Sequence, residues 1–550
     1  MKTEDVLPIS SALALAAVAR STLRMNIIVT GLTFGVVHVL VSSIVRSRKA
    51  RSLAPGPTLW PVLGNVLQLP MENPWETYSK WADIYGDIIH VEVLGQPIIL
   101  LSSAEVAKDL LDKRSSIYSN RPHMASYGVR SVSIPARPHE LLIRTSVASV
   151  GFSQGFVLQP YGEEWRRQRK IANQDYNQAT VPRYYNLQEA QARKLVESVM
   201  NDSSSLVDEI KMRIASIIID ANFGYEVKSK NDPFYTLPLL AMEKFGQASV
   251  PGAFLVDFIP QLRYLPEWMP GTGFLKTAKE WRKIMTDASW TPYLWAKENV
   301  PKGAAHTPNM CATALSRAGG QLSKEEEFSL VWAGSAMLGG GLDTNMSTVL
   351  SFIVAMLRYP EIQAKAQAEL DSVIGTTRLP SITDRQSLPY IRSLITEVHR
   401  WAPVIPLCLP HALTEDDVYN GIHLPKGSLV MPNVWHMLHD ARVYEHPEKF
   451  IPERYNSSDV EMQKVTDLVF GFGRRACPGM YFAQGSIFAI VTTMLATCEI
   501  VPIKDSQGKP VIPEVAYTSG TICFPKDVKA SFKPRSPQAK VLLAQSSSAH

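Results

Sequence analysis

The first clear pattern along the chain is an apolar stretch without charged side chains at residues 25–45. Its length of about 21 residues is enough to cross a hydrocarbon core of roughly 30 Å, which predicts a transmembrane anchor. Arg46, Arg48 and Lys49 follow directly, so the positive-inside rule places the C-terminal side in the cytoplasm and residues 1–24 in the lumen. A cleaved signal peptide is the alternative, and the length of the apolar run disfavours it.

The chain behind this stretch divides by composition into three parts. Residues 46–61 are basic and then rich in proline, which predicts a stiff, extended hinge. Residues 62–535 carry the periodic apolar patterns of a folded domain. Residues 536–550 are mainly polar and lack periodicity, so we expect a disordered tail there.

Most patterns within the domain are helical, and a few indicate strand hairpins. The clearest helix begins with a capping box at Ser323 and ends at Tyr359, before a proline. A helix of that length spans about 54 Å and would cross the whole domain. Residues 417–431 predict a hairpin with a turn at Asn420-Gly421. The patterns together predict a mainly α fold with small β-sheets.

Composition narrows the functional classes. The formal net charge of +5 is mildly basic for 550 residues and does not call for a nucleic-acid partner. The five cysteines form no C-x-x-C pair and are odd in number, which argues against a disulfide framework and for a reducing compartment. A free thiolate can serve as a metal ligand in such a compartment.

Candidate chemistry concentrates in residues 470–479, which read Phe-Gly-Phe-Gly-Arg-Arg-Ala-Cys-Pro-Gly. One interpretation takes Gly471, Gly473 and Ala476 as a dinucleotide-binding turn, which would indicate a nicotinamide-dependent dehydrogenase. This spacing alone is a weak signal, and the chain has no evident second βαβ half. Two arginines and a proline are also unusual at a tight pyrophosphate turn.

The other interpretation uses every residue of the stretch. Cys477 would be a thiolate ligand of haem iron, and such a ligand favours O–O cleavage. The thiolate needs shielding and backbone N–H donors, and Gly473 and Gly479 would let the backbone approach the sulfur. A helix over residues 479–497 would direct its positive end at the thiolate. Arg475 could pair with a haem propionate. A lone cysteine is usually a small buried hydrophobe, but the ten-residue pattern favours the ligand.

The pattern Phe470-x-x-Gly473-x-Arg475-x-Cys477-x-Gly479 resembles the cysteine-ligand loop of the cytochromes P450 at every defined position. The resemblance implies the cytochrome P450 fold behind one transmembrane helix, and haem b bound by this loop with Cys477 as the axial ligand. It also implies a monooxygenase that inserts one oxygen atom of O2 into a lipophilic small molecule. The local sequence is similar to fungal microsomal members of secondary metabolism, with a terpenoid or an aromatic or alkaloid precursor as substrate.

Three consecutive glycines, 339–341, lie in the middle of the long predicted helix. Each costs about 1 kcal/mol relative to alanine, so either a kink that makes room for a diatomic ligand or tight helix packing is needed to explain them. Asp343 and Thr344 follow and could relay protons to oxygen. The stretch resembles the oxygen-activation site of the family, with Asn345 where many members have a second threonine.

Glu397 and Arg400 share a helix face, and an E-x-x-R pair is by itself most often an ordinary surface ion pair. The later segment that contains Arg454 resembles the meander motif of the family. This resemblance implies a structural network of Glu397, Arg400 and Arg454 behind the haem. Tyr455 stands where phenylalanine is commoner.

Two further basic positions resemble haem contacts of the family. Trp165 and Arg169 match its W-x-x-x-R helix, in which the arginine and the tryptophan bind a haem propionate. His411 stands where the family has a basic propionate contact. As a lone histidine it is equally compatible with simple burial in the core.

The resemblance is interrupted at residues 128–148, where serine, arginine, proline and histidine follow no pattern. The stretch is either a loop insertion or translated intron sequence, and we hypothesise the second. An mRNA that encodes the stretch would contradict this. The region normally covers the substrate pocket, for which we expect further contacts within residues 328–340, 404–409 and 517–522.

The implied reaction converts R–H, O2, NADPH and a proton into R–OH, water and NADP+. The sequence shows no flavin site, so an NADPH–cytochrome P450 reductase would deliver the electrons, at a basic face that includes Arg166, Arg167 and Arg474. The resemblance and the apolar anchor imply a single-pass protein of the endoplasmic reticulum membrane with a cytosolic catalytic domain. A non-catalytic haem protein is a third alternative.

Overall fold

The computed structural model describes residues 53–122, 151–248 and 264–547. The predicted anchor at 25–45 and the stretch at 128–148 lie outside the described residues, as does the first part of the hinge. Within the described residues, two helices are long and apolar enough to cross a membrane, α12 (Lys324–Arg358) and α17 (Met480–Thr497). Their apolar windows are 78% and 72% buried, so both are core helices.

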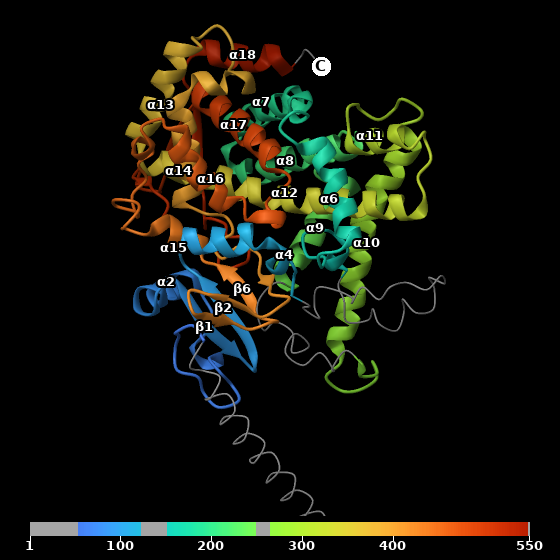
Figure 1. Ribbon diagram of the computed structural model, residues 1–550. Coiled ribbons are helices and arrows are strands. Elements are labelled where there is room, and N and C mark those ends of the chain that lie inside the picture. The colour runs from blue at the N-terminus through green and yellow to red at the C-terminus, as the bar shows by residue number, and fades with distance from the viewer. Residues whose placement is uncertain (1–52, 123–150, 249–263, 548–550) are drawn as a thin grey trace, which may run out of the picture.

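Helices form most of the described structure, and α12 runs through their middle (Figure 1). It starts at the predicted capping box of Ser323 and Glu326, and Tyr359 is its C-cap. The expected mainly α fold is therefore confirmed. The other helices are α2 (Pro74–Tyr85), α3 (Ala104–Ala107), α4 (Ser115–Tyr118), α6 (Glu163–Tyr176), α7 (Tyr185–Asn201), α8 (Leu206–Phe223), α9 (Pro233–Ala248), α10 (Gly273–Asn299), α11 (Met310–Arg317), α13 (Pro360–Val373), α14 (Pro389–Trp401), α15 (Val434–His439), α16 (Asp459–Val469) and α18 (Pro537–Ser547).

The strands form small sheets at the edges of the helical body. The strands are β1 (Ile88–Val93), β2 (Gln96–Leu101), β3 (His411–Ala412), β4 (Asp417–Tyr419), β5 (Ile422–Leu424), β6 (Leu429–Pro432), β7 (Cys498–Lys504), β8 (Pro510–Val511) and β9 (Ala530–Pro534). One sheet has the order β1-β2-β6-β3, and β8-β7-β9 form another. The first sheet lies below most of the helices in the view of Figure 1, next to α2 and α15.

The predicted hairpin is partly correct. Strands β4 and β5 pair antiparallel around Asn420-Gly421, where both turn residues have positive φ. The following segment does not extend this hairpin, because β6 pairs in parallel with β2 and antiparallel with β3. The sheet thereby joins segments more than 300 residues apart, and it fixes His411 on β3.

The end of the chain corrects one expectation. The tail predicted to be disordered forms α18, which packs on α7. Ala539 and Leu543 are 4% and 2% exposed, and Leu543 belongs to the main core. A short helix of this kind is stabilised by tertiary packing more than by its own sequence. Residues 548–550 lie outside the described part.

Candidate active site

A cavity of about 290 Å³ lies between α12, α6 and the segment that joins α16 to α17. Cys477 and Thr344, predicted from distant parts of the sequence, both line it. Most of its other lining side chains are aliphatic, aromatic or methionine, and they come from many segments, among them α9, α10 and α12. A concave, mainly apolar space with a few polar groups is the usual form of a small-molecule site.

Cys477 lies on the loop before α17, and its exposed side chain faces this cavity. Its backbone N–H donates to the Phe470 carbonyl at 2.7 Å. Burial among protein atoms raises the pKa of the thiol, while a hydrogen bond from the Gly479 backbone N–H and the charge of Arg169 lower it. The exposed surface of the thiol is therefore open to the cavity and shielded from bulk water. This is the environment that a thiolate ligand to a metal requires.

The two glycines of this loop have different roles. Gly479 is the N-cap of α17 and stands beside the sulfur, since a Cβ there would lie 3.9 Å from Sγ. Gly473 was expected to admit the backbone to the sulfur, and the structure gives another reason. Its φ is +50°, and a Cβ would lie 2.2 Å from the Leu111 carbonyl oxygen. Gly473 thus permits close packing of the loop against the helical turn Lys108–Lys113.

The geometry contradicts the dinucleotide interpretation of the same loop. A dinucleotide-binding turn connects a β-strand to a helix within a βαβ unit. Here the segment that precedes Gly471 is helix α16, and Gly473–Arg475 form a short helical turn. The loop therefore lacks the strand that a pyrophosphate-binding turn needs.

Helix α12 forms the wall that contains Thr344, and its three glycines divide between the two expected reasons. A Cβ at Gly339 would lie 2.9 Å from the sulfur of Met242, and one at Gly341 would lie 2.7 Å from Cδ1 of Ile218. A Cβ at Gly340 would meet nothing within 4 Å. Tight packing explains the outer two glycines, and the middle one leaves open space at the cavity.

The predicted proton-relay residues follow on the same helix. The Thr344 hydroxyl lines the cavity and donates to the Gly340 carbonyl at 2.8 Å. Asp343 is half-buried and does not line the cavity, and burial raises its pKa to about 6, opposed by the charge of Lys211. Asn345 donates to the Gly341 carbonyl at 2.7 Å. Asp343 can therefore hold a proton near neutral pH one residue from the cavity hydroxyl.

Three guanidinium groups gather at the cavity edge near the cysteine loop. Arg475 donates to the carbonyls of Ser119, Phe156 and Gln159 at 2.7–2.9 Å, and Arg169 donates to the Ala476 carbonyl at 2.8 Å. The third is Arg121, which the sequence analysis did not select. Its donors reach the carbonyls of Val157, Leu409 and Pro410 at 2.7–3.0 Å.

The charge of these arginines fits a dianionic cofactor. Burial and their mutual repulsion lower the pKa of Arg475 to about 8, and burial lowers that of Arg121 to about 10. Among the described residues, no carboxylate pairs with Arg121, Arg169 or Arg475. The indole N–H of Trp165 also has no acceptor in the described part, although the ring lies 4.9 Å from the Arg475 guanidinium. Buried cations and an unpaired donor beside a cavity suit two propionate groups.

His411 behaves as a core residue. It is buried on β3, and its Nδ1 lies 2.9 Å from the Tyr118 carbonyl oxygen. Burial and the charges of Arg121 and Arg475 lower its pKa to about 3. The imidazole is therefore neutral at physiological pH and does not line the cavity. The sequence left open whether His411 contacts a propionate or is simply buried in the core. The structure favours a core residue whose hydrogen-bond partner is the Tyr118 carbonyl.

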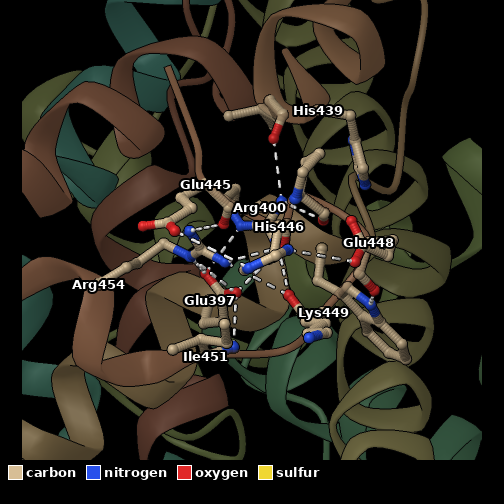
Figure 2. Close-up of polar contacts among 12 residues, drawn as sticks. Glu397, Arg400, His439, Glu445, His446, Glu448, Lys449, Ile451 and Arg454 are labelled. Carbon is tan, nitrogen blue, oxygen red and sulfur yellow. Dashed lines mark hydrogen bonds and ion pairs between the residues drawn. The ribbon is translucent and has the colours of Figure 1, made fainter. Parts of the chain in front are cut away.

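Glu397, Arg400 and Arg454 meet in one network (Figure 2). Glu397 and Arg400 are fully buried on α14, and their bidentate pair has two distances of 2.8 Å. Arg454 Nε donates to the same carboxylate at 3.1 Å. The Tyr455 hydroxyl, not expected to take part, donates to it at 2.8 Å. The sequence predicted the three charged members, and it missed the hydroxyl.

Arg400 uses all of its hydrogen-bonding capacity. A guanidinium group has five N–H donors. Two of them bond Glu397, and the others bond the carbonyls of Leu438, Pro447 and Lys449 at 2.8–3.0 Å. A single side chain thus fixes the path of a loop of the meander segment behind the cysteine loop. Buried charges are stable in this setting because they are paired and fully hydrogen-bonded.

The predicted residues divide into those at the cavity and those that support it. Trp165, Arg169, Thr344, Phe470, Arg475, Cys477 and Gly479 line the cavity. The lining does not include Asp343, Glu397, Arg400, His411, Arg454 or Gly473. Each of the three expected substrate-contact ranges contributes, for example through Ser335, Val404 and Ile522. Contributions from α9 and α10 were missed, because their methionine and aromatic residues carry no motif.

A cysteine thiol in a shielded cavity, opposite a helix with an acid–hydroxyl pair, defines a haem-thiolate type of site. The protein-family model for Cytochrome P450 matches residues 54–524 of this chain. The chain therefore belongs to the cytochrome P450 family of monooxygenases. Members of this family carry haem with a thiolate ligand.

Relatives of similar length support the assignment. Cytochrome P450 monooxygenase 105 of Postia placenta (strain ATCC 44394 / Madison 698-R) is 55% identical over 500 residues, which cover 91% of this chain and 92% of the relative. Cytochrome P450 monooxygenase claR of Ampulloclitocybe clavipes is 36% identical over 521 residues, which cover 94% of this chain and 92% of the relative. A solved zebra fish cytochrome P450 with abiraterone superposes with a TM-score of 0.64 at 20% identity, over 84% of this chain and all of that one. This last likeness shows the fold.

Proposed function

We propose that this protein hydroxylates, or oxidises in a related way, a lipophilic small molecule of fungal secondary metabolism, such as a terpenoid or an aromatic or alkaloid precursor. The observation that carries the proposal is the position of the Cys477 thiol in a mainly apolar cavity that Thr344 also lines. An apolar lining selects lipophilic substrates because it removes their surface from water.

Haem b, when bound, would supply the activation of O2 and the electron-rich thiolate push that favours O–O cleavage. Cys477 would hold the iron through its thiolate sulfur, and the Gly479 N–H would moderate the charge on that sulfur. Arg121, Arg169 and Arg475 would bind the propionates, because each lines the cavity without a carboxylate partner in the described part, and Arg121 and Arg475 are buried.

Residues in the middle of α12 would deliver protons. Thr344 presents a hydroxyl at the cavity, and Asp343 next to it titrates near pH 6. A carboxyl group with such a pKa can both release and recover a proton at physiological pH. We assign the proton supply to this pair, with Thr344 as the group that contacts the reacting oxygen.

NADPH would be the source of electrons, through a membrane-bound cytochrome P450 reductase with an acidic docking surface. The exposed guanidinium groups of Arg166 and Arg474 lie 5.7 and 5.1 Å from the same ring, that of Tyr161. Arg167 contributes less charge, because Glu164 and Glu325 pair with it. Two adjacent exposed cations near the cysteine loop favour the docking of an acidic partner.

We place the protein in the endoplasmic reticulum membrane, anchored once, with the catalytic domain in the cytosol. The support is the apolar stretch 25–45 and the exposed Trp60, Leu67 and Met71, which follow it in the sequence and are 55–83% exposed. A variant that lacks residues 1–45 should partition less into membranes than the full chain. Equal sedimentation of both with microsomes would contradict this location.

The central experiment is the reduced, CO-treated absorption spectrum of the wild type and of Cys477→Ser. The wild type should give the Soret band of a thiolate-ligated haem, and the variant should lose it while its circular dichroism remains native. NADPH consumption and product formation should then be measured with reductase and candidate lipophiles. A variant that keeps both the band and the turnover would overturn the proposal.

A further inference from the structure

Two serines form a polar pair in the otherwise apolar part of the cavity wall. Ser335 on α12 lines the cavity and is 9% exposed, and Ser289 on α10 is fully buried behind it. Their hydroxyl oxygens are 2.8 Å apart. The lining side chains from the helices that cover this part of the cavity are apolar, and they include Met242, Phe245 and Met285.

The hydroxyl of Ser335 differs from the other hydroxyls that α12 presents to the cavity. Thr344 and Thr348 donate to the backbone carbonyls four residues before them, at 2.8 and 3.0 Å. In this structure their single hydrogens bond to the helix backbone, so either hydroxyl must leave that bond before it can donate into the cavity. Ser335 instead interacts with a hydroxyl of another helix, Ser289.

Counting hydrogens shows what Ser335 can offer to a ligand. Ser289 has two acceptors in reach, the Met285 carbonyl at 2.7 Å and the Ser335 hydroxyl at 2.8 Å, but it has one hydrogen. The Ser289 hydroxyl donates to that of Ser335, so Ser335 accepts this bond and keeps one lone pair for a ligand in the cavity. The hydrogen of Ser335 is then free to donate into the cavity. The pair can thus serve either a hydroxyl or a carbonyl group.

We infer that Ser335, positioned by Ser289, is a specificity residue that anchors an uncharged oxygen atom, a hydroxyl or a carbonyl, of an otherwise lipophilic substrate. The inference rests on the proposed function and names the substrate class more closely. A buried hydroxyl in an apolar wall loses hydrogen bonds to water, so a ligand that replaces them is preferred over a pure hydrocarbon.

The position of the anchor sets the distance to the reaction. Ser335 precedes Thr344 by nine residues on one continuous helix. At about 1.5 Å per residue, the two lie roughly 13 Å apart along the axis of α12. The anchored oxygen and the oxidised carbon should therefore lie at well-separated positions of the substrate.

The test measures binding of three probes of one chain length: 1-dodecanol, 2-dodecanone and dodecane. Equilibrium dialysis of the full-length holoprotein with each radiolabelled probe gives dissociation constants that do not depend on turnover. Ser335→Ala should weaken binding of the alcohol and the ketone about fivefold, the usual effect of one neutral hydrogen bond. Binding of dodecane should stay unchanged or become tighter.

The matched control is Ser347→Ala, which removes a buried hydroxyl of the same helix that does not line the cavity. It should leave the binding of all three probes as in the wild type. Ser335→Cys, with a similar size and a poor hydrogen-bonding group, serves if the alanine variant does not fold, and it should reproduce the loss for the alcohol and the ketone.

Each result decides the inference. A loss for the alcohol and ketone alone, in the Ser335 variants alone, supports it. Equal losses for all three probes, no loss, or a loss in Ser347→Ala instead would overturn it. The reduced, CO-treated spectrum of the same preparations keeps this result separate from the proposed function. A normal thiolate spectrum with unchanged probe binding refutes only the anchor, and a wild type without that spectrum refutes the monooxygenase.

Discussion

The hydroxyl of Tyr455 gives a sharp test of how the buried charge network is stabilised. Tyr455 is 2% exposed, and its hydroxyl donates to Glu397 at 2.8 Å. Burial and the charge of Glu397 raise its pKa, so it remains a donor throughout the physiological range. A hydrogen bond to a charged group contributes about 1.5–3 kcal/mol, so Tyr455→Phe should lower the free energy of unfolding by that amount.

A larger loss is expected when the charge itself is removed. Glu397→Gln keeps the shape of the side chain but leaves the fully buried Arg400 without its counter-charge. Breaking a buried pair in this way costs about 3–5 kcal/mol, a large part of the stability of a typical domain. The free energy of unfolding of Tyr455→Phe should therefore lie between those of the wild type and Glu397→Gln.

Tyr444→Phe is the matched control, because it removes a hydroxyl beside the same network. The ring of Tyr444 lies 5.5 Å from the Arg400 guanidinium and 5.9 Å from that of Arg454, and phenylalanine retains the ring. Thermal unfolding by circular dichroism at one fixed scan rate gives the order of the variants. A Tyr455→Phe midpoint equal to that of the wild type, or an equal loss in Tyr444→Phe, would refute the reasoning.

Four further outcomes follow from the described geometry. Thr344→Ala should reduce product formation roughly 10²-fold while NADPH oxidation continues, and normal coupling would contradict the proton-supply role. Burial raises the pKa of Asp343 from 3.8 to about 6, so the native state loses stability as the pH rises through that range. The thermal midpoint of Asp343→Asn should therefore rise relative to that of the wild type between about pH 4 and pH 7. Arg474→Glu should slow reduction by the reductase and weaken its salt dependence, and unchanged rates in stopped-flow measurements would argue against the docking face. Leu543→Ala on α18 should cost about 2–5 kcal/mol, whereas the more exposed Val541→Ala should cost little; equal thermal midpoints would show that α18 does not support the core.

The parts of the fold that the sequence predicted are those with local signals. The ends of α12 follow from a capping box at Ser323 and from the proline after Tyr359, and both signals lie within a few residues of the helix end. The turn at Asn420-Gly421 is equally local. The cysteine loop was predictable for the same reason, because its ligand, its glycines and its arginine lie within ten residues.

The features that the sequence did not predict depend on segments that meet only in the fold. Arg121 reaches the carbonyls of Leu409 and Pro410, which are almost 300 residues away. Ser335 is paired with Ser289 of another helix. Neither contact leaves a periodicity or a motif, and only the packing of the helices brings the groups together. The helix α18 is a similar case, since burial of Leu543 in the core outweighs a polar local sequence.

The cavity therefore has a fixed side and an adaptable side. On the fixed side, Arg121 and Arg475 bond to backbone carbonyls, so their positions follow from the path of the chain and tolerate little change. On the other side, Met242 and Met285 line the wall, and unbranched methionine side chains adapt to ligands of different shape. Substitutions on the adaptable side can alter substrate choice without disturbing the bonds that hold the cysteine loop. The residues that we assign to the reaction therefore lie in recognisable sequence motifs, whereas the proposed selectivity depends on single side chains such as Ser335.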